Sequence, residues 1–212
     1  MFEKITRRIF LKGSLLFGSV IFLGGFLSRR DAAAKVYLRP PGAVPENKFT
    51  GQCIRCFICG EICPNKAIKF IGIDGGLINI GTPYIVPREQ GCILCMKCGQ
   101  VCPTGALKKI ENDGDVIIKN VYMGRAVVDK TICYSYNNRI CGFCQQACPY
   151  PEVALKIEVW ARPVITDKCV GCGLCEKACI QVPQAIRIIP KGEEHKIAFY
   201  ENYKMPIYDE HL

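Results

Sequence analysis

Cysteines are the residues of this sequence that are equipped for chemistry, and they fall into four runs of four with none left over. The first two runs read C-x2-C-x2-C-x3-C-P, a bacterial spacing that holds a [4Fe–4S] cluster. A cubane cluster needs four thiolates, so we predict four [4Fe–4S] clusters and no catalytic residue. The predicted ligands are Cys53, Cys56, Cys59 and Cys63 in run one; Cys92, Cys95, Cys98 and Cys102 in run two; Cys133, Cys141, Cys144 and Cys148 in run three; and Cys169, Cys172, Cys175 and Cys179 in run four.

Runs three and four depart from this spacing without losing a ligand. In run three, seven residues, from Tyr134 to Ile140, separate the first two cysteines where the other runs have two. In run four, Ile180 takes the place of the proline that follows the last cysteine elsewhere. Cys133 is therefore the least regular of the predicted ligands.

Other chemistry of cysteine fits this pattern less well. Disulfides are common in exported proteins, but close neighbours in C-x2-C runs cannot all pair without strain. Zinc sites use C-x2-C pairs, yet zinc does not require a third thiolate at x2 and a fourth at x3 in four successive runs. The sequence has no C-x-x-C-H, so covalent c-type haem is not supported.

The runs could share clusters in two ways. The fourth cysteine of such a run ligates the neighbouring cluster. Sequential pairing exchanges fourth cysteines between runs one and two and between runs three and four. Nested pairing joins run one to run four and run two to run three. We favour nested pairing, which puts Cys179 with the first three cysteines of run one; a structure that places Cys102 against Cys53 would refute it.

A common pattern of elements surrounds the runs. Short apolar strands are predicted before runs two to four, at residues 84–86, 126–129 and 163–167, and a small-then-apolar pair follows each run. A short helix is predicted to open around each fourth cysteine. The fold class is α+β, with tandem two-[4Fe–4S] lobes made of four βαβ-type half-repeats after an N-terminal signal helix. The residues expected to line the sheets are Ile68, Phe70, Leu107, Ile110, Leu155, Ile157, Ile186 and Ile188.

The amino terminus has the pattern of an export signal. Arg7 and Arg8 form a twin-arginine pair, residues 13–28 carry no charge, and Ala32 to Ala34 form a small-residue stretch. Clusters are assembled in the reducing cytoplasm, so a protein that uses them outside must cross the membrane folded, as twin-arginine cargo does. A transmembrane helix usually needs about 20 residues, so a cleaved signal is favoured over a retained membrane anchor.

The chain divides into a signal or anchor at 1–34, a linker at 35–50, a four-cluster domain at 51–190 and a tail at 191–212. Within the four-cluster domain, the runs lie at 53–63, 92–102, 133–148 and 169–179. The full chain has a net charge of +9, and without residues 1–34, which hold six Lys/Arg and two acidic residues, the net charge is +5. That mild excess suits an anionic lipid surface or an acidic redox partner, and a solvated lysine-rich face explains it equally well. No basic cluster is interleaved with aromatic residues, so no nucleic-acid partner is expected. His195 and His211 lie in the tail and are not expected to be catalytic.

Several motifs outside the cysteines carry a family resemblance. They are the twin-arginine signal, the segment from Leu38 to Ala43, Phe49 ahead of run one, and the segment from Gly81 to Tyr84 ahead of run two. With these, the chain resembles the ferredoxin-type proteins of periplasmic nitrate reduction and methylamine utilisation, the NapG/MauM type. The loop in run three and the missing proline in run four look like variants of that family.

The resemblance implies a role on the periplasmic side of the cytoplasmic membrane, with a membrane surface close by. Such proteins work with a polytopic ferredoxin-type membrane protein that oxidises quinol, and pass electrons to a c-type cytochrome or a reductase in the periplasm. The chain would be a relay and no enzyme on its own. Two alternatives remain: the iron–sulfur subunit of a molybdenum or tungsten oxidoreductase, and a structural metal-binding module without redox work.

Overall fold

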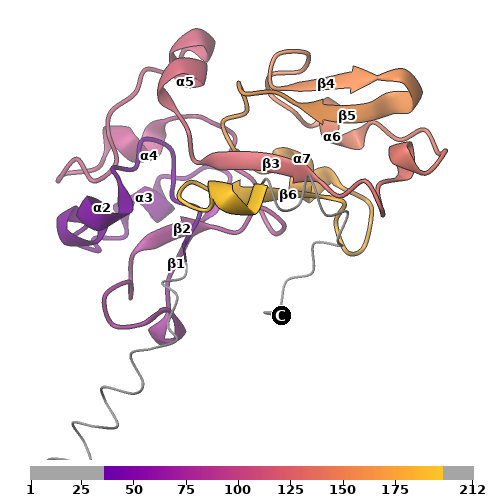
Figure 1. The fold of residues 1–212 in the computed structure, drawn as a ribbon. Helices are drawn as coiled ribbons and strands as arrows, with labels where there is room; N and C mark the ends of the chain where they lie inside the picture. Colours follow the sequence, from indigo (N-terminus) through magenta and orange to yellow (C-terminus); the bar gives the residue numbers. More distant parts are fainter. Residues whose placement is uncertain (1–35, 198–212) are drawn as a thin grey trace, which may run out of the picture. The chain divides into compact units, whose positions relative to one another are not determined.

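The computed structural model describes residues 36–197 (Figure 1). These residues belong to one compact unit that begins at Val36. The predicted signal at 1–34, including the twin-arginine pair, and residues 198–212 of the predicted tail lie outside the described residues. Across residues 36–197, no helix has both the length and the apolar character needed to cross a bilayer.

Three antiparallel two-stranded sheets connect the cysteine runs. Strand β1 (Ile68–Phe70) follows run one and pairs with β2 (Pro83–Ile85), which precedes run two. Strand β4 (Leu155–Glu158) follows run three and pairs in the same way with β5 (Arg162–Ile165), which precedes run four. Strand β3 (Gly124–Val128), before run three, pairs with β6 (Ile186–Pro190), after run four. Runs three and four are thus enclosed by two ladders.

The first lobe has a reduced version of the second ladder. A single antiparallel bridge joins Ala43 to Leu107, and the Val44 N–H donates to the Ala106 carbonyl at 3.0 Å. Among the described residues, therefore, only runs three and four have named strands on both sides. The α+β class is confirmed, and the expectation of four βαβ-type half-repeats is met only in part, because the chain around Ala43 and Leu107 pairs over one bridge.

Each run contains one short helix between its second and fourth cysteines. These helices are α3 (Ile58–Glu61), α4 (Lys97–Gln100), α6 (Phe143–Gln146) and α7 (Leu174–Ala178). The prediction that a helix opens around the fourth cysteine was wrong. The residue directly after each second cysteine has left-handed backbone and forms the N-cap, so the helix begins there and carries the third cysteine.

The segment predicted to be a linker, 35–50, is instead packed from Val36 onward. It contains most of α2 (Glu46–Gln52), where the Phe49 side chain is fully buried against Ala106 and Leu107. Between the lobes lies α5 (Gly114–Asn120), capped by the Asp113 carboxylate, which accepts the N–H of Asp115 and of Val116. Three single-turn helices complete the described elements: η1 (Ile73–Gly75), η2 (Tyr134–Tyr136) and η3 (Val159–Ala161).

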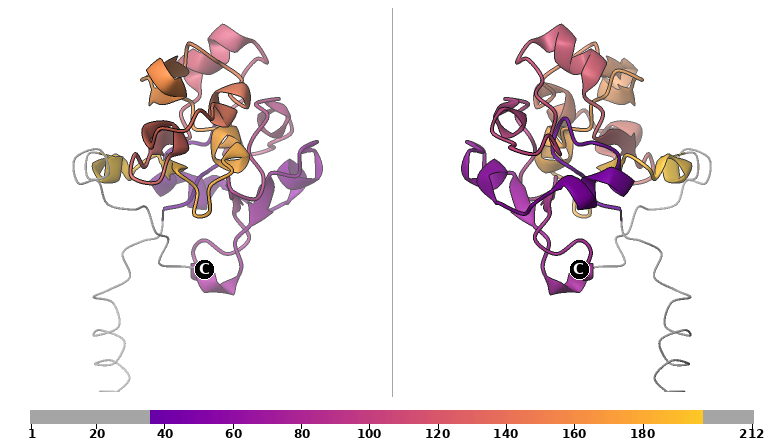
Figure 2. Two further views of the ribbon diagram at one scale, coloured as in Figure 1. Left: turned by 90° about the vertical axis from the view of Figure 1, so that its right-hand side faces the viewer. Right: turned by 90° about the vertical axis from the view of Figure 1, so that its left-hand side faces the viewer.

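One apolar core runs through both lobes, which lie side by side in the two views of Figure 2. Of the eight residues predicted to line the sheets, Leu107, Ile110, Leu155, Ile186 and Ile188 are buried, and Ile68, Phe70 and Ile157 are half-buried. Trp160 lies at the surface in η3 and is 60% exposed.

Candidate iron–sulfur sites

The sixteen cysteines are free thiols that gather in four sets in space. In each set, three thiols come from one run and the fourth comes from another. Site 1 is Cys53, Cys56, Cys59 and Cys102; site 2 is Cys63, Cys92, Cys95 and Cys98; site 3 is Cys148, Cys169, Cys172 and Cys175; site 4 is Cys133, Cys141, Cys144 and Cys179.

The nested pairing predicted from the sequence was wrong. Cys102 lines the same cavity as Cys53, Cys56 and Cys59, and Cys179 lies with the thiols of run three. The cause is the short antiparallel connection between runs: β1–β2 folds run one onto run two, and β4–β5 folds run three onto run four. Fourth cysteines are therefore exchanged between consecutive runs.

The four sites are neighbours in numerical order. The thiolate of Cys59 in site 1 contributes to the raised pKa of Cys98 in site 2. Between sites 2 and 3, the Cys92 N–H donates to the Cys172 carbonyl at 2.7 Å. Between sites 3 and 4, the Cys144 thiolate contributes to the raised pKa of Cys175. The thiol sets thus form a row from site 1 to site 4.

Left-handed backbone shapes each run around its site. In runs one and two, the residues flanking the second cysteine have positive φ although they carry side chains: Arg55 and Phe57 at 58° and 62°, and Leu94 and Met96 at 57° and 55°. Run four has glycine at both equivalent positions, Gly171 and Gly173. For residues with a Cβ this conformation costs about 1–2 kcal/mol each, which the packing of the run must offset. In all three runs these positions lie directly before and directly after the second cysteine.

Backbone N–H groups point at the sulfur of the fourth cysteine in each run. Ala67 donates to Cys63, Leu107 to Cys102 and Ala185 to Cys179, each at 3.4 Å, and in run three a backbone hydrogen bond from Tyr150 lowers the pKa of Cys148 against the effect of burial. Three of these donors belong to the small-then-apolar pairs that follow the runs. Such hydrogen bonds favour the thiolate form and tune iron–sulfur centres.

Burial and crowding raise the pKa of eight of the sixteen thiols at the sites. Burial, followed by the neighbouring thiolates of Cys53 and Cys56, raises the pKa of Cys59 to about 11. Burial is also the main cause that raises the pKa of Cys92 and of Cys172 to about 12. Several thiolates enclosed in apolar surroundings therefore require a compensating positive charge.

The donor set and the space between the thiols fit a [4Fe–4S] cluster. Sites 1, 2 and 3 each surround a cavity whose other lining is largely apolar. Within residues 36–197, no three His, Cys, Asp or Glu side chains converge as they would on a single metal ion. Four separated thiolates around an enclosed space are what a cubane requires, and iron would supply the positive charge.

Exposure differs along the row. Cys56 of site 1 is the exposed member of the sixteen, while Cys172 and Cys175 of site 3 are buried. Apolar side chains surround both ends at the surface. They are Ile54, Phe57 and Ile58 beside site 1, and Ile140, Phe143 and Ile180 beside site 4.

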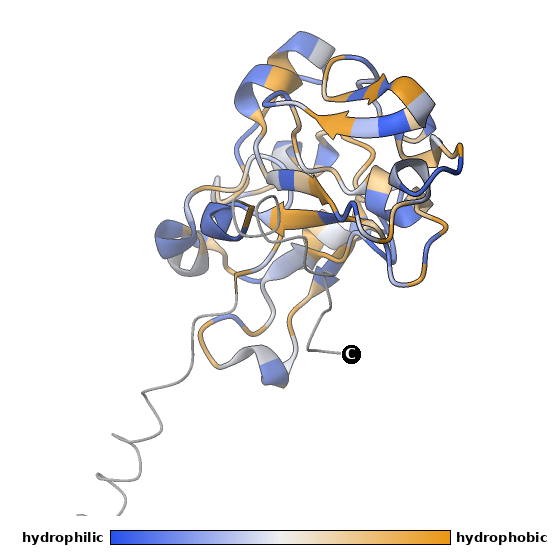
Figure 3. Cartoon of the chain, turned by 45° about the vertical axis from the view of Figure 1, so that its right-hand side comes forward, coloured by the Kyte–Doolittle hydropathy of each residue, from blue (hydrophilic) through white to orange (hydrophobic). Residues whose placement is uncertain are grey.

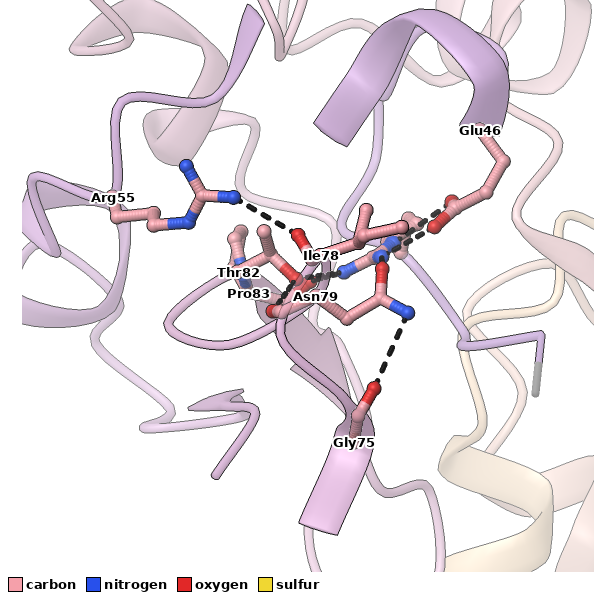
Figure 4. Close-up of polar contacts among 8 residues, drawn as sticks. Glu46, Arg55, Gly75, Ile78, Asn79, Thr82 and Pro83 are labelled. Carbon is pink, nitrogen blue, oxygen red and sulfur yellow. Dashed lines mark hydrogen bonds and ion pairs between the residues drawn. The ribbon is translucent and has the colours of Figure 1, made fainter. Parts of the chain in front are cut away.

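Two arginines that position site 1 were not identified as functional from the sequence. Arg55, inside run one, donates from Nε to the Ile80 carbonyl at 2.8 Å. Arg39 is buried and donates to the Thr82 hydroxyl at 2.9 Å and to the Pro83 carbonyl at 2.8 Å, so it holds the start of β2 (Figure 4). Arg39 belongs to a family motif, which was the available signal.

Runs of thiols around enclosed spaces, within an α+β fold, define an iron–sulfur protein of the ferredoxin type. Family models agree: a 4Fe-4S dicluster domain matches residues 52–106, and a 4Fe-4S binding domain matches residues 162–180. These segments cover runs one, two and four, while run three, with its long loop, lies outside both.

Curated relatives cover most of the chain. Methylamine utilization ferredoxin-type protein MauM of Methylobacillus flagellatus is 36% identical, over 90% of this chain and 82% of its own length. MauM of Methylorubrum extorquens is 37% identical, over 77% of each chain. Ferredoxin-type protein NapG of Escherichia coli is 36% identical, over 80% of this chain and 79% of its own. The chain therefore belongs to the family of NapG and MauM ferredoxin-type proteins and is an iron–sulfur protein of electron transfer.

Proposed function

We propose that the chain relays electrons through four [4Fe–4S] clusters, from a quinol-oxidising membrane protein to a periplasmic c-type cytochrome or reductase. The observation that carries the proposal is the row of thiol sets, in which each set contacts the next. The Cys92–Cys172 hydrogen bond links the two lobes at the middle of that row. A relay needs such continuity, whereas separate structural metal sites do not.

All sixteen cysteines are assigned as iron ligands in this proposal, in the four sets described above. A bound cluster supplies one-electron chemistry, and the chain supplies its surroundings. The thiols fix the iron, the N–H groups of Ala67, Leu107 and Ala185 stabilise charge on sulfur, and the apolar lining excludes water.

The two ends of the row are the expected points of exchange with partners. Site 1 reaches the surface at Cys56, and site 4 is bordered by the exposed Ile140 and Phe143. Apolar side chains at the surface are typical of the centre of protein interfaces. Sites 2 and 3, which lie between these ends, would then pass electrons only along the row.

We place the protein on the periplasmic side of the cytoplasmic membrane, exported folded by the twin-arginine route, with the signal cleaved or retained as an anchor. The support is the sequence around Arg7 and Arg8 and the need to assemble clusters before export. The membrane partner is proposed to be the polytopic ferredoxin-type protein implied by the family resemblance.

Reconstitution tests the relay. The full chain, loaded with clusters, is added to vesicles that contain the quinol-oxidising partner and reduced quinol, and cluster absorbance is followed. The proposal expects bleaching of the clusters that depends on the partner and on quinol. Stable co-purification with a molybdopterin subunit, with no reduction by quinol vesicles, would instead assign the chain to a molybdenum or tungsten oxidoreductase.

The long loop of run three is the place to test docking of the acceptor. Arg139 is exposed there, with its guanidinium 5.2 Å from the centre of the Tyr134 ring. Arg139→Ala should slow electron delivery to the acceptor while the iron content stays unchanged. Lys156→Ala, which removes another exposed cation from the same lobe, is the control. An unchanged rate in Arg139→Ala would dismiss the loop as a docking place.

A further inference from the structure

The loop between β1 and β2 carries an unusual concentration of exposed aliphatic side chains. In this loop, residues 72–80, Ile73, Leu77 and Ile78 are 83%, 85% and 72% exposed. Figure 3 shows hydrophobic colour on this loop, which projects away from the sheets in Figure 1. We call residues 72–80 the apolar loop. Side chains of this kind gain nothing from water, so their arrangement suggests a surface that covers them.

The apolar loop is held in one shape by hydrogen bonds to its backbone. Arg55 donates to the Ile78 carbonyl at 2.9 Å (Figure 4). It also donates to the Ile80 carbonyl at 2.8 Å. The Asn79 amide donates to the Gly75 carbonyl at 3.4 Å, and Asn79 N–H donates to the Gly76 carbonyl at 3.1 Å. The carbonyls of Gly75, Gly76, Ile78 and Ile80 are thus hydrogen-bonded within the protein, while the aliphatic side chains face outward. That combination suits a loop that enters an apolar medium.

The same hydrogen bonds connect the apolar loop to site 1. Arg55 stands between Cys53 and Cys56, and its side chain also packs against Gly81 at the end of the loop. A surface that covers the apolar loop therefore lies close to the most exposed thiol, Cys56.

The first described residues of the chain lie beside this loop. The Tyr37 hydroxyl lies so close to Gly75 that a Cβ there would be 2.8 Å from it, and the Tyr37 ring contacts Tyr84 of β2 at 5.5 Å between centroids. Val36 follows Ser28, the end of the uncharged stretch, by eight residues. An extended chain of that length reaches at most about 29 Å. If residues 13–28 lie in a membrane, the apolar loop is restricted to the neighbourhood of that membrane.

The sequence that leads to Val36 carries charges that suit an anionic lipid surface. Within the apolar loop, Asp74 is the one charged residue, while Arg29, Arg30 and Lys35 precede Val36 in the sequence. Basic residues beside an apolar element strengthen attachment to anionic lipids. A soluble acidic protein would match the basic residues but not the aliphatic loop.

We propose that Ile73, Leu77 and Ile78 insert into the lipid surface of the membrane and turn site 1 toward it. The inference rests on the proposed placement of the chain at a membrane. It gives the row of sites a direction, because site 1 becomes the end at which electrons arrive from a membrane donor and site 4 the end that faces the periplasm.

Vesicle flotation tests this without electron transfer. A protease site placed between Arg30 and Lys35 lets the full chain fold with its clusters before residues 1–30 are cut away. Iron content after cutting verifies that the released protein is intact. Released protein should float with vesicles of phosphatidylethanolamine and phosphatidylglycerol. The double variant Leu77→Asp with Ile78→Asp should bind roughly 30-fold more weakly or worse, because two aliphatic side chains no longer leave water.

The matched control is Ile140→Asp with Val159→Asp, which adds the same charges at residues that are 77% and 75% exposed. It should float like the wild type. Released wild-type protein that does not float, or a loop variant that floats equally well, would overturn the proposal. A loop variant that loses binding only to vesicles containing the membrane partner would assign the loop to that protein. A loop variant that converts a dimer to a monomer would assign it to a second copy. Flotation can succeed while quinol reduction fails, so the two proposals are tested separately.

Discussion

Replacing Arg39 should weaken the first lobe specifically, because this buried guanidinium joins three segments. Its Nε donates to Oε2 of Glu46 in α2 at 2.9 Å, and a second guanidinium nitrogen pairs with Oε1 of the same carboxylate. It also donates to the Thr82 hydroxyl and the Pro83 carbonyl at the start of β2. It also lies over the Phe49 ring, 4.7 Å from the centroid. Arg39→Met keeps most of the apolar stem and removes only the charge and the donors.

The expected loss can be worked out from exposure. The Pro83 carbonyl loses its buried donor, which costs about 1–3 kcal/mol. The Thr82 hydroxyl still donates to the Asn79 carbonyl at 2.6 Å, so its loss is smaller. The Glu46 side chain is 42% exposed and can be rehydrated. We therefore expect a loss of about 2–3 kcal/mol from Arg39→Met. For Glu46→Gln we expect less than about 1 kcal/mol, because the Glu46 end of the pair faces solvent and the Gln amide oxygen can still accept a hydrogen bond from the guanidinium.

Urea titration of the cluster-loaded full chain, followed by iron–sulfur absorbance under anaerobic conditions, measures the difference. With a slope of about 2–3 kcal/mol per molar urea, Arg39→Met should lower the midpoint by about 1 M. Glu46→Gln should shift it by less than half as much. Equal shifts in both variants would refute the reasoning, since they would mean that the ion pair, and not the buried contacts to β2, holds the lobe.

Further predictions concern the cysteine pairing and the backbone. Cys59→Ser with Cys102→Ser should lose no more iron than either single change, because both thiols belong to site 1; loss of the iron of two clusters in an iron assay would restore nested pairing. Cys98→Ser with Cys102→Ser should lose the iron of two clusters under either pairing and serves as the control. Gly171→Ala should prevent assembly of a stable protein, because its Cβ would lie 2.5–2.7 Å from the Gly124 backbone, while Gly105→Ala, also at positive φ but in open space, should cost only about 1–2 kcal/mol in the same urea titration. Asp113→Ala removes the cap of α5 and should cost about 1 kcal/mol, with iron content unchanged; a loss of iron would show that α5 supports a site directly.

The local parts of the fold could be predicted from the sequence because they depend on short patterns. Short apolar segments before the runs predicted three strands at 84–86, 126–129 and 163–167, and the structure has β2, β3 and β5 at 83–85, 124–128 and 162–165. The cysteine spacing identified three thiols of every set, since those lie within a few residues of each other.

The fourth thiol of each set could not be read from spacing. Its partner depends on which strands pair, and β1–β2 and β4–β5 bring consecutive runs together. The start of each helix could not be predicted either. It is set by a residue with left-handed backbone, such as Phe57 or Met96, and the side chains of these residues do not reveal that conformation. The segment 35–50 was read as a linker because its prolines suggested an extended chain, yet burial of Phe49 and Arg39 fixes it to the first lobe.

Native mass spectrometry of the full chain, purified without air, tests the central claim most directly. Four [4Fe–4S] clusters add about sixteen iron and sixteen sulfide atoms to the mass of the polypeptide. The account predicts that species, with successive loss of whole clusters on activation. A chain that carries zinc, or that holds only two clusters when all sixteen thiols are reduced, would contradict it.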